Sequence, residues 1–257
     1  MIASGRSDSE KVHELHPWTD VLSRNLYRMH GVLTVAHLVT SLLMFALVAT
    51  QFGDAGKVQL FDTYASRKSS VPEIIRLGVF QVGYLCAAFL LMAATDHAVV
   101  LLCRTSHTNY LRNGENPYRW AEYAVSLSTM NVLIMVLCGV LELGTLLLGV
   151  LLSMTCIACG WLHESVGMGP DMGRVGWIPY VTYWILVFVN VSRADSLPSF
   201  VWVIIIILFV LQTAFGVVPW MFKAHPYIYT EFAFCALSAV SKQLLAWITF
   251  FGVLSMK

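Results

Sequence analysis

The stretch "ALSAVSKQLLAW", residues 236–247, places Lys242 near the middle of a run that is almost continuously apolar from Phe232 to Leu254. Runs of this length cross a membrane as a helix, since about 20 residues span a hydrocarbon core of about 30 Å. A charged lysine at the centre of such a helix costs about 3 kcal/mol or more. The lysine therefore needs a partner or a chemical role.

Composition places the whole chain in a membrane. Of its 257 residues, 58% are hydrophobic and only 12% are charged, whereas soluble domains carry about 25% charged residues. The formal net charge of +1 argues against a nucleic-acid partner, because phosphate recognition needs a clustered basic surface. An integral membrane protein is expected.

Seven apolar runs are long enough to be spanning helices, and polar connectors rich in Gly, Pro, Asp and Ser separate most of them. The expected fold is an all-α bundle of seven transmembrane helices. The runs cover residues 26–52, 73–103, 117–141, 143–162, 175–191, 200–222 and 227–254.

The first 24 residues are polar and lack the apolar core and small-residue cleavage site of a signal peptide, so they are interpreted as a retained tail. Residues 25–257 are then the membrane domain. With the N-terminus inside, nine Lys and Arg residues face the cytoplasm and six face outward. This excess predicts a cytoplasmic N-terminus and an outer C-terminus. The inner set is Arg6, Lys11, Arg24, Arg28, Arg104, Arg112, Arg119, Arg174 and Lys223.

The six cysteines lie in or at the ends of predicted spans, where disulfide frameworks are not built. Cys156 and Cys159 form a C-x-x-C on one predicted helix, without a second pair or a suitably spaced histidine. Apolar packing is the preferred interpretation, and no metal site is expected.

The informative residues are the ionisable ones inside the spans, which normally face the bundle interior. For Lys242 the residues leave three interpretations open: a structural ion pair, an ion-coupling site in a carrier, or a covalent anchor. The anchor suits lysine, because a buried amine loses its proton readily and can form a Schiff base with an aldehyde. The set is His37, Asp96, His97, Glu122, Glu142, Glu231 and Lys242.

Spacing narrows the search for the partner of Lys242. Glu231 and Ser238 share its helix face, but Glu231 lies about 16 Å away along the axis and cannot reach it. Glu122, in "NPYRWAEYAVSLSTM", follows a proline in the first helical turn. By the span boundaries Glu122 lies shallower than Lys242, but both helices start on the same side of the membrane. A helical side chain leans toward its helix N-terminus, so the lysine amine is carried toward Glu122. The alternative is that Glu122 pairs with Arg119, three residues away.

Several of these strings together resemble heliorhodopsins, retinal-binding proteins distantly related to microbial rhodopsins. The match is strongest in the third, sixth and seventh spans and extends to the first. The strings are "RWAEYAVSLS" (119–128), "YIYTEFAFCALSAVSKQLLAW" (227–247), "PSFVWVIIIILFVLQTAF" (198–215) and "HLVTSLLM" (37–44).

The resemblance implies a rhodopsin-type bundle in which Lys242 carries all-trans retinal as a protonated Schiff base, with Glu122 as its counterion. It places Ser238 near the Schiff base, and His37 and His97 in a polar pocket on the cytoplasmic side that accepts the proton. Taken alone, each histidine is better explained by a satisfied interior hydrogen bond. The residues expected to surround the polyene are Ser126, Met130, Trp161, Phe209, Phe215 and Phe234.

Three positions depart from the family pattern. Phe234 stands where a tyrosine is usual, Val218 where an asparagine precedes Pro219, and Thr40 where a glutamine is common. These changes remove polar groups from the interior and leave the lysine and its counterion untouched. They bear on absorption colour and photocycle rate.

Three functions remain open. The first is a light sensor that signals to a partner protein, the second a light-gated proton or cation channel or transporter, and the third a carrier without retinal. The outer half offers few ionisable groups, apart from Glu142, so the sensor is preferred over transport. No enzymatic activity is expected, and the resemblance implies a homodimer in the cell membrane.

Overall fold

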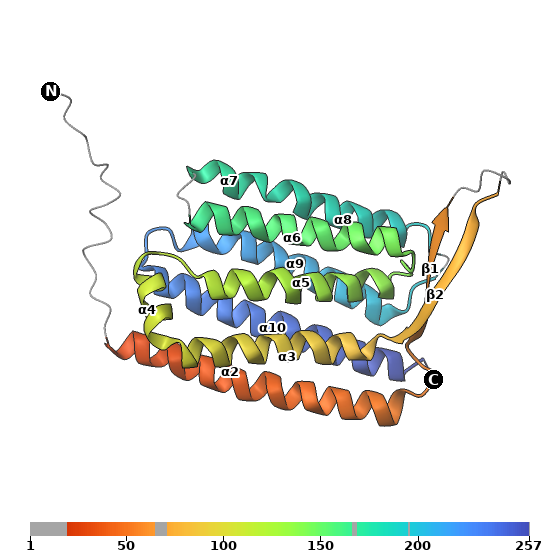
Figure 1. Ribbon diagram of the computed structural model, residues 1–257, viewed down its shortest axis with the longest axis horizontal. Helices are drawn as coiled ribbons and strands as arrows, with labels where there is room; N and C mark the ends of the chain where they lie inside the picture. The colour runs from red at the N-terminus through yellow and green to blue at the C-terminus, as the bar shows by residue number, and fades with distance from the viewer. Residues whose placement is uncertain (1–19, 65–70, 166–168, 195, 257) are drawn as a thin grey trace.

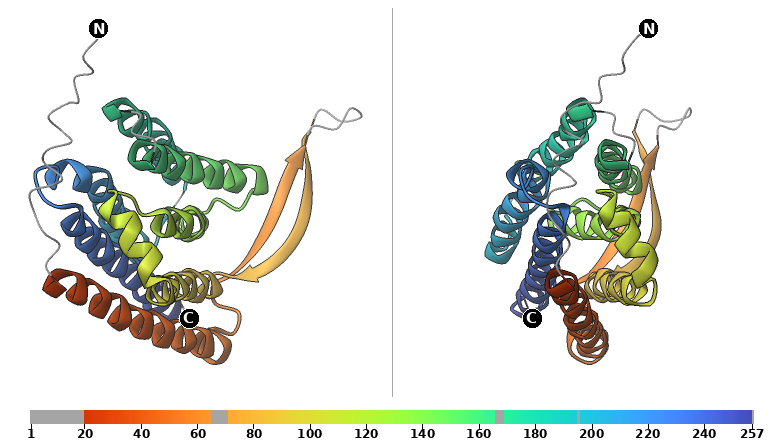
Figure 2. Two further views of the ribbon diagram at one scale, coloured as in Figure 1. Left: turned by 60° about the vertical axis from the view of Figure 1, so that its left-hand side comes forward. Right: turned by 90° about the vertical axis from the view of Figure 1, so that its left-hand side faces the viewer.

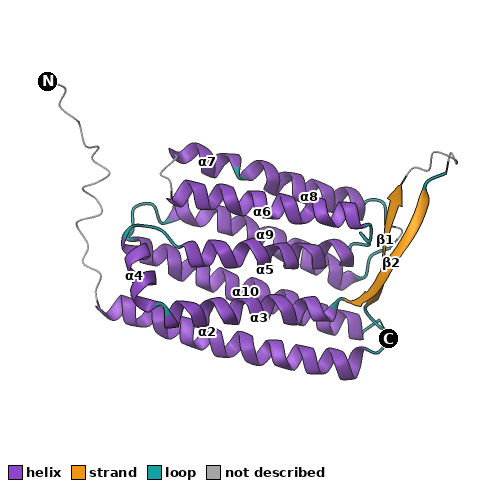
Figure 3. Cartoon of the chain, viewed as in Figure 1, coloured by secondary structure: helices purple, strands orange, loops and turns teal. Residues whose placement is uncertain are grey.

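The computed structural model describes residues 20–64, 71–165, 169–194 and 196–256. Most of the predicted N-terminal tail therefore lies outside the described residues. Within them, the chain is a bundle of long helices with one β-hairpin at its end (Figure 1). The prediction of an all-α fold holds for the bundle but does not include the hairpin. Figure 3 shows the helices of the bundle in purple and the two strands of the hairpin in orange.

The elements follow the labels of Figure 1. The helices are α2 (Asp20–Leu47), α3 (Gly83–Leu102), α4 (Arg104–Arg112), α5 (Pro117–Leu137), α6 (Leu143–Ser165), α7 (Gly169–Val175), α8 (Trp177–Val191), α9 (Ser199–Met221) and α10 (Tyr227–Leu254). A π-helical turn, η1 (Val48–Phe52), ends α2, and the strands are β1 (Lys57–Tyr64) and β2 (Glu73–Gln81).

Seven helical segments among the described residues are long and apolar enough to cross a membrane. The prediction of seven spans is confirmed in number, and the last span begins and ends where expected. The segments are Val21–Phe52, Gly83–Leu102, Pro117–Leu137, Leu143–Ser165, Met172–Val191, Ser199–Met221 and Tyr227–Leu254. Helix α2 begins at Asp20, six residues before the predicted start of the first span at Leu26.

The predicted second span was wrong in its first part. Residues 73–81 form β2, which pairs antiparallel with β1, and the helix begins only at Gly83. Strand and helix are both apolar here, so hydropathy alone could not separate them. The hairpin projects away from the bundle (Figure 2). It is attached through the backbone N–H of Phe61, which donates to the carbonyl of Leu141 at 3.1 Å.

The two ends of the bundle differ. One end, called the α4 end, holds α4 and the first turns of α2, α5 and α10; the other, called the hairpin end, holds β1, β2 and the end of α10 (Figure 1). The predicted connector between the second and third spans contains helix α4, whose buried His107 and Leu111 face the bundle. Asn116 then caps α5 by accepting from the Arg119 N–H at 3.2 Å, with Pro117 in the first turn. This cap fixes the register of α5 and hence the facing of Glu122.

Candidate functional site

Lys242 lies in the interior of the bundle and is only 2% exposed. Its Nζ donates to Ser238 Oγ at 2.6 Å, one turn earlier on α10, and is 3.0 Å from Glu122 Oε1 on α5. The ring of Tyr123 lies 5.2 Å from the same nitrogen, close enough for a cation–π contact. The structure thus brings together the lysine, the carboxylate and the serine that the sequence places on two distant helices.

Arg119 does not compete for Glu122. Its guanidinium forms ion pairs with Glu231 on α10 and Glu164 at the end of α6, so the alternative Arg119–Glu122 pair is not the one the structure contains. Both carboxylates are largely buried, at 1% and 12% side-chain exposure. Glu122 is therefore left to Lys242 as its charged partner.

The ion pairs of Arg119 belong to a polar cluster at the α4 end that sequence reasoning missed. Asn116 donates to Glu231 Oε2 at 2.8 Å, and the Trp120 indole N–H donates to Glu164 Oε1 at 2.8 Å. Tyr227 accepts from Arg119 at 3.1 Å. The fourth span was predicted to end at residue 162, which left Glu164 in the connector that follows. Helix α6 runs three residues further, to Ser165, and so contains Glu164.

The predicted histidine pair lies beside this site. The rings of His37 and His97 stack with centroids 5.7 Å apart, and both residues are buried. The Nε2 atoms of both rings are buried without a hydrogen-bond partner among the described residues. His30, which no motif singled out, shares a hydrogen bond of 2.9 Å with His97 through the two Nδ1 atoms. Spacing could have found it, because His30 and His37 are seven residues apart on one face of α2.

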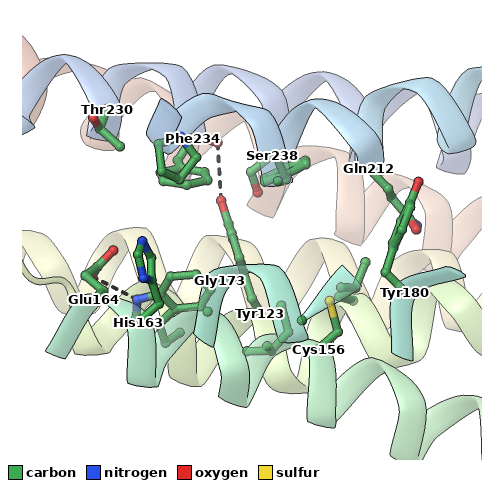
Figure 4. Close-up of a pocket in the computed structure, with 18 of the residues that line it drawn as sticks. Tyr123, Cys156, His163, Glu164, Gly173, Tyr180, Gln212, Thr230, Phe234 and Ser238 are labelled. Carbon is green, nitrogen blue, oxygen red and sulfur yellow. Dashed lines mark hydrogen bonds between the residues drawn. The ribbon is translucent and has the colours of Figure 1, made fainter. Parts of the chain in front are cut away.

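A cavity of about 370 Å³ opens from Lys242, within the range of about 300–1,000 Å³ typical of small-molecule sites. Of the residues expected around the polyene, Ser126, Met130, Phe215 and Phe234 line the cavity, as does Ser238. Figure 4 shows Phe234, Ser238 and Tyr123 along one stretch, with Gln212 and Tyr180 at one end and Glu164 and His163 at the other.

Two of the predicted lining residues lie elsewhere. Trp161 is 48% exposed on α6, and Phe209 is 38% exposed on α9; neither lines the cavity. The Phe209 ring instead packs edge-on against Trp184, with centroids 5.2 Å apart. Helix periodicity could not decide their facing, because α6 and α9 are apolar all round and carry no polar stripe.

Further along the cavity, toward the hairpin end, lies a second buried polar group. Gln212, which lines the cavity, donates to Asn131 Oδ1 at 2.9 Å, and Asn131 donates to Ser153 at 2.7 Å. Each of these contacts joins uncharged groups on different helices. They make the half of the bundle toward the hairpin end more polar than its few ionisable residues suggest, without placing a charge there.

Glu142, at the hairpin end, has a local structural role. It accepts from the backbone N–H of Thr145 at 2.5 Å and of Gly144 at 3.1 Å, at the start of α6. The Thr145 hydroxyl, together with these N–H groups, holds the pKa of Glu142 below its usual value. A carboxylate in this position stabilises a helix N-terminus.

The residues present fit retinal. Lys242 offers a buried amine at the cavity wall, and the walls are mainly apolar and aromatic. Ser126 Oγ is buried at the same wall without a hydrogen-bond partner among the described residues. Gly160 leaves room for the Trp120 ring, because an added Cβ would come within 2.5 Å of it. An elongated, apolar aldehyde matches the amine of Lys242 and the apolar walls of the cavity.

Known structures share this fold. Two solved structures superpose on most of the chain: a light-driven proton pump from Leptosphaeria maculans and a thermophilic rhodopsin from Rubrobacter xylanophilus. The first has a TM-score of 0.64 at 12% identity, over 88% of this chain and 93% of the pump. The second has a TM-score of 0.61 at 14% identity, over 88% of this chain and 97% of the rhodopsin.

At such low identity these structures establish a shared fold only. A comparison with curated proteins finds no match. The sequence profile of one family, however, matches residues 26–254, which is nearly the whole membrane domain. The chain therefore belongs to the heliorhodopsin family, and it is a multi-pass membrane protein of the retinal-binding, light-responsive kind.

Proposed function

We propose that this protein is a light sensor in which Lys242 carries all-trans retinal as a protonated Schiff base and Glu122 is its counterion. The observation that carries the proposal is the buried contact of 3.0 Å between Lys242 Nζ and Glu122 Oε1 at the wall of the cavity. An amine in this place is positioned to attach a ligand that fills the cavity. The attached nitrogen keeps a positive charge that needs a carboxylate beside it.

Bound retinal supplies absorption of visible light and rotation about a double bond. The protein's own residues do the rest. Glu122 holds the positive charge at Lys242, and Ser238 Oγ, 2.6 Å from Nζ, orients that nitrogen. The unpartnered Nε2 atoms of His37 and His97 are acceptors for a proton that leaves the site.

Movement of charge in this low-dielectric interior biases the helices between two arrangements, and the change is the signal. The polar cluster at the α4 end is well placed to report it, since Arg119 ties α5 to α6 and α10 through Glu164 and Glu231. The receiver of the signal is a partner protein at that surface.

The α4 end is proposed to face the cytoplasm, which puts the N-terminus inside. Among the described residues, the positive charges at the α4 end outnumber those at the hairpin end by seven to three, the bias expected of the cytoplasmic side. The seven are Arg24, Arg28, Arg104, Arg112, Arg119, Arg174 and Lys223; the three are Lys57, Arg76 and Arg193. Protease protection in sealed vesicles measures this orientation, and cleavage of the hairpin from the cytoplasmic side would contradict it.

The family resemblance also implies a homodimer. Strand β2 supports a contact outside the bundle, because Ile74 and Val79 are 68% and 61% exposed, and exposed apolar surface commonly marks an interface. The mass of the detergent-solubilised protein, corrected for detergent by light scattering, tests the dimer; a one-chain mass would contradict it.

The decisive experiment is an absorption spectrum of the purified protein after addition of all-trans retinal. A visible band that hydroxylamine bleaches is expected, because hydroxylamine cleaves a Schiff base. Absence of any band, in a protein that remains folded, would exclude the sensor and return Lys242 to the role of an ion-coupling residue in a carrier.

Sustained transport is not expected. The charged residues near Lys242 lie toward the α4 end, whereas Glu142 serves as a cap at the start of α6 and is not part of a path. Whole-cell recordings under illumination should show brief charge displacement and no steady current at any holding voltage. A steady photocurrent that reverses with the proton or cation gradient, and is lost in Glu142→Gln, would make the protein a light-gated channel.

A further inference from the structure

Three exposed arginines at the α4 end lie on two neighbouring helices. Arg24 and Arg28 are one turn apart in the first part of α2, and Arg104 begins α4. None of the three forms an ion pair with a described residue, whereas the buried Arg119 at the same end has two carboxylate partners. Exposed positive charge that the protein itself does not neutralise attracts a negatively charged partner.

The side chain of Tyr27 holds Arg28 and Arg104 on one surface. Its ring lies under the guanidinium of Arg104, with 4.3 Å between Cζ and the ring centroid, and this contact orients the arginine. Its hydroxyl donates to the Arg104 carbonyl at 3.2 Å and lies 2.7 Å from Thr108 Oγ1, so it ties α2 to α4. Tyr27 directly precedes Arg28 in the chain. The two arginines therefore flank the same tyrosine, although they are far apart in the sequence.

An exposed apolar stripe continues from Arg28 along α2 toward the hairpin end. Residues 24, 28, 32, 35, 39 and 42 follow one another at intervals of three or four, so they lie on one face of the helix. The apolar members, called the α2 stripe, are each at least 57% exposed; they are Val32, Val35, Val39 and Leu42. Leu102, two residues before Arg104, is also exposed. On both helices the arginines thus border apolar surface that runs toward the middle of the bundle.

The length of α2 and its π-helical end places these arginines at the membrane surface. The apolar helical segment Val21–Phe52 has 32 residues, whereas about 20 residues cross the hydrocarbon core. Counted back from Phe52, these end at about residue 33, so Arg28 lies about 8 Å beyond the core, in a headgroup layer about 5–8 Å deep. Most of the α2 stripe lies inside the core. This face therefore has the order of a lipid molecule, with the charged part at the surface and the apolar part below it.

We propose that this face, formed by the three arginines and the α2 stripe, binds an anionic glycerophospholipid of the leaflet at the α4 end. The guanidinium groups of Arg28 and Arg104 bind the headgroup phosphate, because a planar guanidinium can donate two parallel hydrogen bonds to phosphate oxygens. Arg24, one turn further out, adds positive charge that favours a headgroup with a net negative charge. The acyl chains lie along the α2 stripe.

The charges on this face argue against a second copy of the chain as its occupant. In a two-fold symmetric contact, the same patch of both chains meets at the same depth in the membrane. The arginines of α2 would then face the arginines of the other copy, and like charges repel. A lipid phosphate instead neutralises them. The face lies outside the cavity at Lys242, so this proposal stands independently of retinal.

Native mass spectrometry of the full chain, released from a non-ionic detergent, tests the proposal. Phosphatidylglycerol and phosphatidylcholine with the same acyl chains are added in equal amounts, and phosphatidylglycerol should predominate on the wild-type protein. Arg28→Gln and Arg104→Gln should each weaken the binding of phosphatidylglycerol about fivefold, the effect of one basic residue beside an anionic surface, and the double variant about 25-fold. The binding of phosphatidylcholine should change little. Because both arginines are exposed, the variants should fold, and circular dichroism checks this.

Lys223→Gln is the matched control, because it removes one exposed positive charge at the same end of the bundle but beyond the end of α9. It should leave the binding of phosphatidylglycerol unchanged. Equal binding of the two lipids, or a fivefold loss in Lys223→Gln as well, would reduce the effect to general surface charge and overturn the site. Complete displacement of the lipid by inorganic phosphate would assign the arginines to a soluble anion instead. Lipid bound to single chains but never to dimers would assign the face to a second copy.

Discussion

Lys242→Ala should abolish the visible band completely. The structure places no other described lysine in the interior of the bundle: Lys57 is at the start of β1 and Lys223 is exposed beyond the end of α9. Without the amine at residue 242, retinal can enter the cavity but cannot be attached there, because its aldehyde needs an amine. The measurement is a spectrum of the purified variant after incubation with all-trans retinal.

The matched control is Lys57→Ala, which removes a surface lysine whose ion pair with Asp54 is exposed. Its band should equal that of the wild type, since an exposed pair contributes little to stability. If Lys242→Ala still formed a band that hydroxylamine bleaches, another nucleophile would be the anchor and the assignment would be wrong. Circular dichroism of the variant confirms that the bundle is intact.

Glu122→Gln should have the second largest effect. The substitution leaves the positive charge at residue 242 without its partner at 3.0 Å, and breaking a buried pair in this way costs about 3–5 kcal/mol. The Schiff base should therefore hold its proton on the order of a hundred- to thousandfold less tightly. The pigment should absorb further to the red where it stays protonated, and in the near ultraviolet where it does not.

A pH titration of the absorption spectrum measures both shifts. Glu231→Gln is the matched control, because it neutralises a buried carboxylate that pairs with Arg119 and not with Lys242. It should leave the midpoint of the titration near that of the wild type. A spectrum of Glu122→Gln that does not change across the titration would move the counterion to Asp96.

A charge inside a membrane-spanning helix needs a partner or a chemical role, so the sequence singled out Lys242. Spacing left Glu122 to pair with either Lys242 or Arg119, and the family resemblance favoured Lys242. The cap at Asn116 and Pro117 fixed the start of α5, and five residues after Pro117 the helix presents Glu122 to α10. Hydropathy likewise set the number of spans, since each had to be long enough to cross the hydrocarbon core.

Contacts that depend on how helices rotate against each other could not be predicted in the same way. Trp161 and Phe209 lie on helices that are apolar on every face, so the sequence could not show which way these side chains point. Both lie outside the cavity. The apolar residues 73–81 read equally well as the start of a helix or as a strand. Only their pairing with β1 made them the hairpin.

For this protein, the sequence alone determined the membrane bundle and singled out Lys242 as a buried charge that needs a partner or a chemical role, while the family resemblance supplied Glu122 as the expected counterion. The bundle and the importance of Lys242 follow from local rules: hydrophobic length and the cost of a buried charge. The tertiary structure decided which of the remaining polar groups meet, drawing Arg119 to Glu164 and Glu231 and placing His30 between His97 and His107. The reason is physical: these groups come from different helices, and only the packing of those helices sets the distances between them.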